Sequence, residues 1–263
     1  MAQKKLKIVA IIPAHMASIR FPGKVLFPFF GYPMIEHVRR RALLSKKISD
    51  VYIATCDQEI ADAMIANGGK IIMTGNQHQN GTSRVAEAAR ELDASHIILL
   101  QGDEPLLMPN YIDEVVNAIT KEPEGDAWNA TGPIESIDEI DRHSFVKCAV
   151  SRNGHIMYCF RRGPSYAPIE QQQSYIRKIL GIIAFRKEFL QKFVQFVPAR
   201  TEMSESIEQM RIIENGHKLL SIPFNESLPS VNEPGEVNIV IEYMKNKAIQ
   251  RELLVTTFGI EFS

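Results

Sequence analysis

The stretch KIVAIIPAHMASIRFPGK, residues 7–24, joins an apolar run to a loop with basic side chains, and it decides the fold class. Similar runs recur as DVYIAT at 50–55, KIIMT at 70–74 and HIILLQ at 96–101. Each run is followed by turn residues and then by helical spacing, at 33–45, 57–67, 82–92 and 110–120. Strands that alternate with helices form parallel sheets covered by helices. We therefore predict an α/β fold, with a Rossmann-like, mostly parallel sheet and helices on both faces.

The second half of the chain has a different pattern. FVKCAVS and GHIMYCF predict two paired strands joined by a turn at 152–154. We expect a long loop over 161–175 and helices over 203–215 and 236–247, the first of which stops at an Asn-Gly pair. These features indicate a single α/β domain over 1–263, with an inserted smaller α/β lobe over roughly 130–230.

Composition excludes several classes of protein. The 263 residues are 45% hydrophobic and 23% charged, which is ordinary for a globular protein. The 30 Lys and Arg against 31 Asp and Glu predict no nucleic-acid partner. No apolar stretch is long enough for a signal peptide or a membrane span, and three cysteines without metal-ligand spacing indicate a reducing compartment. We expect a cytoplasmic protein with no membrane contact.

Four loops are candidates for the functional site, because ligands of open parallel sheets bind beyond the carboxyl ends of the strands. They are PAHMASIRFPGK at 13–24, TGNQHQNGTSR at 74–84, QGDEP at 101–105 and VNEPGE at 231–236. The first loop carries His15, Arg20 and Lys24, which together with backbone N–H groups suit a polyphosphate. It matches neither the Walker pattern nor the dinucleotide-binding glycine pattern.

The QGDEP loop presents a carboxylate at the same predicted edge. Mg²⁺ is bound by one or two carboxylates together with substrate phosphates, so Asp103 is a candidate ligand. The alternative is that Asp103 caps the following helix. In the third-strand loop, Thr82 is expected to cap a helix and Arg84 to lie at its start, while His78 is expected to be a polar loop residue.

Several motifs occur in one order that resembles the CMP-Kdo synthetases, the cytidylyltransferases that activate 3-deoxy-manno-octulosonate (Kdo) for lipopolysaccharide. They are IIPAHMASIRFPGKVL, GYPMIEHV, ATCDQEIADA, HQNGTSRVAEAA, QGDEPLL, FVKCAVSRNG and IEQMR. The resemblance runs from about Lys7 to Glu236. It implies transfer of CMP from CTP to a sugar acid of the Kdo type, attack of an acceptor oxygen on the α-phosphorus, release of pyrophosphate, a Mg²⁺ cofactor and a homodimer.

The residues and the resemblance together predict the site. Catalytic residues are Arg20, Lys24 and Asp103; nucleotide-binding residues are Ala14, His15, Ser18, Gly81, Thr82, Arg84 and Gln101; acceptor-binding residues are Arg161, Arg162, Glu208 and Gln209; metal ligands are Asp103, Asn232 and Glu233.

Departures from the family pattern leave the acceptor open. His15 stands in place of a second Arg, and Asn232 in place of a metal-binding Asp, with Glu233 beside it. Family His and Tyr positions are Ile179 and Ile183, and Arg162 is an added cation. The alternatives are a cytidylyltransferase for an acceptor that bears phosphate or phosphonate, and a nucleotide-binding protein without turnover.

Overall fold

The computed structural model describes residues 6–163 and 166–261, which form two compact units. Unit 1 comprises the chain up to Asp113 together with Leu228 onward, and unit 2 comprises Glu114–Ser227. The boundary falls inside helix α4 (Pro109–Lys121). None of the described helices is long and apolar enough to cross a bilayer.

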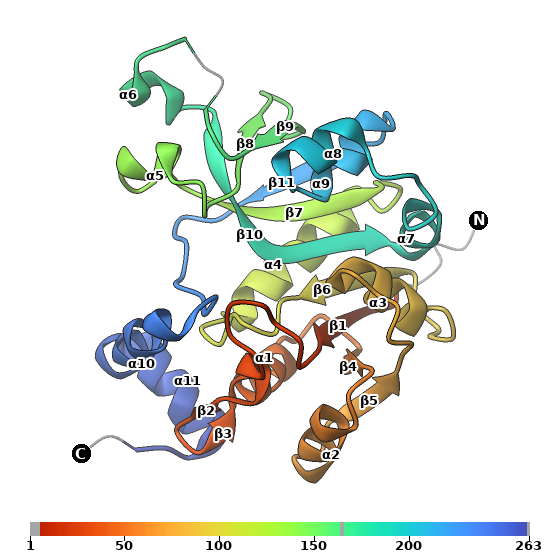
Figure 1. The fold of residues 1–263 in the computed structure, drawn as a ribbon, viewed down its shortest axis with the longest axis vertical. Coiled ribbons are helices and arrows are strands. Elements are labelled where there is room, and N and C mark those ends of the chain that lie inside the picture. Colours follow the sequence, from red (N-terminus) through yellow and green to blue (C-terminus); the bar gives the residue numbers. More distant parts are fainter. Residues whose placement is uncertain (1–5, 164–165, 262–263) are drawn as a thin grey trace. The chain divides into compact units, whose positions relative to one another are not determined.

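Unit 1 contains a parallel sheet in the order β6–β1–β4–β5, shown side by side in Figure 1. Its strands are β1 (Ile8–Ala14), β4 (Asp50–Thr55), β5 (Lys70–Met73) and β6 (His96–Leu100). Every residue of β6 is buried, and so is every residue of β1 but Pro13, which is typical of a sheet covered on both faces. The predicted α/β fold class is confirmed.

Helices follow the strands close to the predicted ranges. They are α1 (Met34–Leu43), α2 (Gln58–Ala66), α3 (Gly81–Ala89) and the first turn of α4. A 3-10 turn η1 (Lys24–Leu26) and a small hairpin, β2 (Pro28–Phe29) with β3 (Tyr32–Pro33), connect β1 to α1. The chain returns to unit 1 through η2 (Pro234–Glu236), α10 (Val237–Asn246) and α11 (Ala248–Phe258). Helix α10 was predicted from the sequence, and α11 was not.

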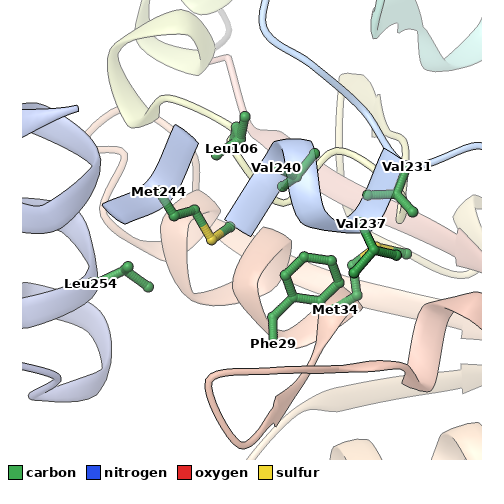
Figure 2. Packing of buried hydrophobic residues seen from close by; sticks show 8 residues of the cluster. All are labelled: Phe29, Met34, Leu106, Val231, Val237, Val240, Met244 and Leu254. Atoms are coloured by element: carbon green, nitrogen blue, oxygen red, sulfur yellow. The ribbon is translucent and has the colours of Figure 1, made fainter. Parts of the chain in front are cut away.

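A buried hydrophobic cluster packs residues from the first and last parts of the chain together within unit 1 (Figure 2). Phe29 and Met34 come from the β2–α1 region, Leu106 follows β6, and Val231 belongs to the VNEPGE loop. Helices α10 and α11 supply Val237, Val240, Met244 and Leu254. Because Val231 is fully buried here, the late loop is anchored beside residues that follow β1 and β6.

Unit 2 contains a mixed sheet in the order β11–β7–β10–β8–β9. Its strands are β7 (Ala127–Gly132), β8 (Lys147–Val150), β9 (Ile156–Phe160), β10 (Ile176–Arg186) and β11 (Leu219–Pro223). Strands β7 and β11 are parallel, and the other pairs are antiparallel. The predicted hairpin is confirmed as β8 and β9. The register of β10 against β7 shifts between Ile179 and Ile183, the two positions that depart from the family pattern.

The helices of unit 2 correct two predictions. They are α5 (Asp138–Asp141), α6 (Ile169–Gln172), α7 (Lys187–Phe193), α8 (Arg200–Glu205) and α9 (Gln209–Glu214). The single helix expected over 203–215 is wrong, because Ser206 adopts a left-handed φ of 55° that ends α8. The loop expected over 161–175 contains α6, and its residues 164–165 lie outside the described part of the chain.

Candidate active site

The central feature of the site is an ion pair between loops that are distant in sequence. Lys24, the last residue of the first loop, places its Nζ 2.5 Å from Oδ2 of Asp103 and donates to the carbonyl oxygen of Val231 at 3.1 Å. The two charged side chains are 12% and 22% exposed. Asp103 is therefore paired with a lysine, and the structure does not use it as the helix cap considered above.

The VNEPGE loop is fixed against the same residues. The backbone N–H of Val231 donates to the carbonyl oxygen of Asp103 at 2.9 Å. The carboxylate of Glu236 accepts from the N–H groups of Asn232 and Glu233 at 2.6 and 3.2 Å. Arg20 donates to Oδ1 of Asn232 at 3.2 Å. Together with the hydrogen bond from Lys24 to Val231, this contact joins the first loop to the late loop twice.

The backbone of the first loop is held from two sides. The N–H of Met16 donates to Oδ2 of Asp57, at the end of β4, at 2.9 Å, and the N–H of Gly23 donates to the carbonyl oxygen of Met16 at 2.9 Å. Gly23 has a φ of +70°, in the left-handed region that favours glycine. This turn brings Lys24 back toward Asp103.

His15 lies on this loop among charged groups. Burial and the nearby positive charges of Arg84 and Lys24 lower its pKa below 6.5, while Asp57 and Asp103 act in the opposite direction. His15 is therefore neutral at pH 7, whereas the arginine usual in the family carries a permanent charge.

The start of α3 forms another wall of the site. Oδ1 of Asn80 accepts from the N–H of Ser83 at 2.9 Å, so Asn80 caps the helix, and the expectation that Thr82 does so is wrong. A Cβ at Gly81 would lie 3.0 Å from Cγ of Pro13, which explains the glycine at this close approach. Arg84 is buried and donates to Oγ1 of Thr74 at 2.6 Å.

His78 is more than a polar loop residue. Its Nε2 contacts the carboxylate of Glu87, and its Nδ1 lies 3.1 Å from Oγ of Ser83. The hydrogen bond from His78 is the main cause that lowers the pKa of Glu87. These contacts connect the loop that precedes α3 to the helix itself.

These elements enclose a cavity of about 180 Å³ in unit 1. The predicted site residues that line it are Ala14, His15, Ser18, Lys24, Gly81, Arg84, Gln101 and Asp103. Its other lining residues are Pro13, Val25, His78, Gln79, Asn80 and Gly102. Four other predicted residues do not line it: the buried Thr82, and Arg20, Asn232 and Glu233.

The donor set suits a metal carried by a nucleotide better than a metal held by protein alone. Among the described residues, no group of three or more His, Cys, Asp and Glu side chains could hold an ion. Asp103 supplies one carboxylate at the cavity, and Mg²⁺ needs only one or two when phosphates complete its coordination.

The predicted acceptor residues lie in unit 2. Arg161 donates from Nε to the carbonyl oxygen of Glu205 at 2.8 Å, and Arg162 donates from Nε to Nε2 of His143 at 2.7 Å. Gln209 donates to Oδ1 of Asn129 at 3.1 Å, and Nδ2 of Asn129 in turn donates to the carbonyl oxygen of Leu180 at 3.0 Å, inside the register shift of β10. Glu208 is the residue before α9.

Sequence reasoning missed two supporting carboxylates. Asp57 holds the first loop through Met16, and Glu87 accepts from the N–H of Gly75 at 3.0 Å as well as contacting His78. The position of Asp57 directly after β4 was a usable signal, since that loop also leaves a carboxyl end of the parallel sheet. Glu87 lies within a helix, where its spacing gave no signal.

This fold and site define a nucleotidyltransferase, and the family model described as Cytidylyltransferase matches residues 9–219. The chain therefore belongs to the cytidylyltransferase family. Two of its relatives are named as octulosonate cytidylyltransferases. The 3-deoxy-manno-octulosonate cytidylyltransferase of Geotalea daltonii is 35% identical over 92% of this chain and 100% of the relative. The 8-amino-3,8-dideoxy-manno-octulosonate cytidylyltransferase of Shewanella halifaxensis is 36% identical over 89% and 97%.

A solved structure agrees with these relatives. It is the CMP:2-keto-3-deoxy-manno-octonic acid synthetase complexed with CTP, which is 33% identical and has a TM-score of 0.86. The match covers 91% of this chain and 98% of that chain. The resemblance inferred from the motifs is confirmed.

Proposed function

We propose that the cavity of unit 1 binds CTP and that the protein transfers the CMP group to 3-deoxy-manno-octulosonate. The observation that carries this proposal is the Lys24–Asp103 pair, which lines a cavity at the carboxyl ends of β1 and β6. The relatives named for this acceptor, and the similar structure complexed with CTP, support the choice of both substrates.

The triphosphate would be held by charge and by backbone donors. Lys24 lines the cavity, and Arg20, which does not line it, is held by Asn232. Arg84 uses its NH1 on Thr74 and Gly75, so its part is to add positive charge and to fix the loop that precedes α3. Oriented groups of this kind stabilise charge that develops on transferring phosphates.

The reaction is a substitution at phosphorus. An acceptor hydroxyl gives up its proton to water, and its oxygen forms a bond to the α-phosphorus while the bond from that phosphorus to the oxygen bridging to the β-phosphorus breaks. Pyrophosphate leaves with the electron pair of that bond. Because little covalent chemistry falls to the protein, positioning and electrostatic stabilisation provide most of the rate.

We propose Mg²⁺ as the cofactor, with Asp103 as its protein ligand. The ion would neutralise charge on the phosphates and the leaving pyrophosphate. Asp103 would hold the ion, and Lys24, which pairs with Asp103 in this structure, would then contact a phosphate oxygen. Asn232 and Glu233 are the candidates for a further ligand, and Oδ1 of Asn232 already serves Arg20.

The resemblance also leads us to propose a homodimer that acts in the cytoplasm and supplies lipopolysaccharide synthesis. Light scattering of the purified protein and fractionation of the source cells test the first two statements. A monomer at micromolar concentration would contradict the dimer.

Pyrophosphate release from CTP and Mg²⁺ with a panel of acceptors tests the function. We expect turnover with 3-deoxy-manno-octulosonate, and far slower turnover when ATP or GTP replaces CTP. The 8-amino analogue is the second candidate, because the relative from Shewanella halifaxensis is named for it. Turnover only with a phosphonate, or with no acceptor of the panel, would contradict the proposal.

A further inference from the structure

Lys147 is a buried cation that the proposed reaction does not use. Its residue is 0% exposed, and it lies at the start of β8. Its Nζ donates to the carbonyl oxygens of Arg142 at 2.8 Å and Phe145 at 3.0 Å, and also to that of Arg161. An ammonium group has three N–H donors, so these three carbonyls use them all.

The partners of this ammonium are unusual for a buried charge. Buried lysines normally pair with a carboxylate, because removing an unpaired charge from water is costly. Lys178, which lies opposite Lys147 in the β8–β10 register, follows that rule and binds Oε1 of Glu139 at 2.8 Å. Lys147 binds main-chain oxygens instead, so its effect is to hold backbone segments in place.

The segments that Lys147 holds have no regular backbone pairing. Residues 142–145 lie between α5 and β8, and Arg161 directly follows β9. The guanidinium of Arg161 then extends the connection, because NH1 donates to the carbonyl oxygen of His143 at 2.7 Å and NH2 to that of Ser206 at 3.2 Å. Two neighbouring cations thus fix three irregular segments of unit 2.

This network determines how Arg161 is presented. Its Nε, NH1 and NH2 each donate once to backbone oxygens, which uses three of the five N–H donors of a guanidinium. Two donors remain, on a side chain whose orientation is already set. A guanidinium with two donors in fixed geometry suits a carboxylate, which arginine binds in a planar, bidentate manner.

We propose that Lys147 is a positioning residue for acceptor binding: it fixes the backbone of Arg161, so that the remaining guanidinium donors meet the carboxylate of the sugar acid. This inference rests on the proposed function for the identity of the acceptor. It assigns Lys147 no contact with substrate, because its three donors are already engaged.

Electrostatics gives this role a dependence on pH. Burial lowers the pKa of Lys147 to about 8, and the positive charge of Arg161 acts in the same direction. The carboxylates of Asp141, Glu205 and Glu139 oppose the shift. Lys147 is charged at pH 7, and above about pH 8 the neutral amine has two N–H donors for three carbonyls. The hydrogen bonds that hold the backbone at residues 142–145 and at Arg161 are then weakened.

A double-mutant cycle tests the proposal. Lys147→Met should raise the KM for the acceptor about tenfold while the KM for CTP stays within about twofold. Arg161→Ala should also raise the KM for the acceptor. Because Lys147 acts through Arg161, the acceptor KM of the double variant should exceed that of Arg161→Ala by no more than about twofold. If the rise in the acceptor KM of the double variant equals the product of the two single rises, the residues act independently and the proposal is overturned.

Lys178→Met is the matched control, because it also removes a buried ammonium from this sheet. It should leave the acceptor KM within about twofold of wild type. An equal rise in both variants would mean general damage to unit 2, and would overturn the proposal.

The wild-type acceptor KM should also rise above about pH 8 and that of Lys147→Met should not. If Lys147→Met does not fold, Lys147→Gln is the substitute, because glutamine keeps two N–H donors. Its acceptor KM should lie above that of wild type and below the tenfold rise expected for methionine. An acceptor KM equal to that of wild type would contradict the positioning role.

Amide hydrogen exchange separates failure of this inference from failure of the proposed function, because it needs no substrate. Lys147→Met should exchange faster than wild type at residues 142–145 and 161–163, and Lys178→Met should not. Unchanged exchange there would overturn the positioning role. Faster exchange without turnover of any sugar acid would instead refute the proposed acceptor.

Discussion

At the scale of single residues, His15 is a departure from the family pattern that lines the proposed nucleotide cavity. The family arginine would carry a permanent charge, whereas burial and the neighbouring Arg84 and Lys24 keep His15 neutral at pH 7. In the proposed reaction the cavity would therefore meet the triphosphate of CTP with one positive charge fewer.

Replacing His15 by arginine restores that charge. We expect His15→Arg to lower the KM for CTP at pH 7.5 by about threefold to fivefold, since one added exposed charge contributes about 1 kcal/mol or less. The pKa of His15 is lowered, so the wild-type side chain gains its proton only as the pH falls below 6.5 toward that lowered pKa. The advantage of the variant should therefore shrink at acid pH. An equal KM for CTP in both proteins at pH 7.5 would contradict this role.

Asn232 is the second informative departure. Its side chain joins Arg20 to the late loop, and it offers a metal only a neutral oxygen. We expect Asn232→Asp to lower the Mg²⁺ concentration for half-maximal activity by about tenfold, the lower end of changes seen when a ligand sphere is altered. Glu233→Gln is the comparison variant. If only Glu233→Gln changes the Mg²⁺ concentration for half-maximal activity, by raising it, the ligand role belongs to Glu233. Insensitivity to both would exclude the late loop from the metal site.

At the scale of elements, sequence patterns predicted strands and their following helices well. The runs at 7–12, 50–55 and 96–101 are mostly buried parallel strands, so burial accounts for their apolar character. The run at 70–74 contains the edge strand β5, whose residues are exposed or half-buried. The cap of α3 was assigned wrongly, because Asn80, Thr82 and Ser83 are all possible caps and only the backbone distinguishes them. The break at Ser206 was missed, because a serine in the left-handed region has no sequence signal.

The cap of α3 gives a prediction at this scale. Asn80→Ala removes the acceptor for the N–H of Ser83 and should lower the free energy of unfolding by about 1 kcal/mol. Thermal unfolding measures it, and a fall of about 2–4 °C is expected for a chain of this size. Asn80→Ser, which retains a capping oxygen, should restore most of the loss. Equal melting temperatures for Asn80→Ala and wild type would contradict the assignment of the cap.

At the scale of the whole molecule, long-range contacts were beyond sequence patterns. Sheet topology placed the loops after β1 and β6 at one edge, which is why Lys24 and Asp103 could be predicted together. The anchoring of the late loop could not be predicted, because Val231 belongs to a cluster of residues that are far apart in sequence, and one of them, Leu254, lies on the unpredicted helix α11. The role of Asp57 was missed for a related reason, since it supports the first loop through a backbone N–H.

The C-terminal helix should therefore matter for stability. Leu254 is fully buried in the cluster that holds Val231, and Leu254→Ala should lower the free energy of unfolding by about 2–5 kcal/mol. Val255 is 44% exposed, and Val255→Ala should change it by less than about 0.5 kcal/mol. Urea unfolding of the two variants measures the difference. Similar stabilities would show that α11 is not part of the core of unit 1.

The most direct test of the account is the turnover of CTP by Lys24→Met. The ammonium that pairs with Asp103 in the cavity should be indispensable to the reaction, so we expect pyrophosphate release with CTP and 3-deoxy-manno-octulosonate to fall by about 10²-fold or more. Lys7→Met removes an exposed ammonium that pairs with Asp93, and should retain wild-type turnover. Circular dichroism should show both variants folded. Turnover by Lys24→Met within twofold of Lys7→Met would contradict the claim that this cavity is the active site.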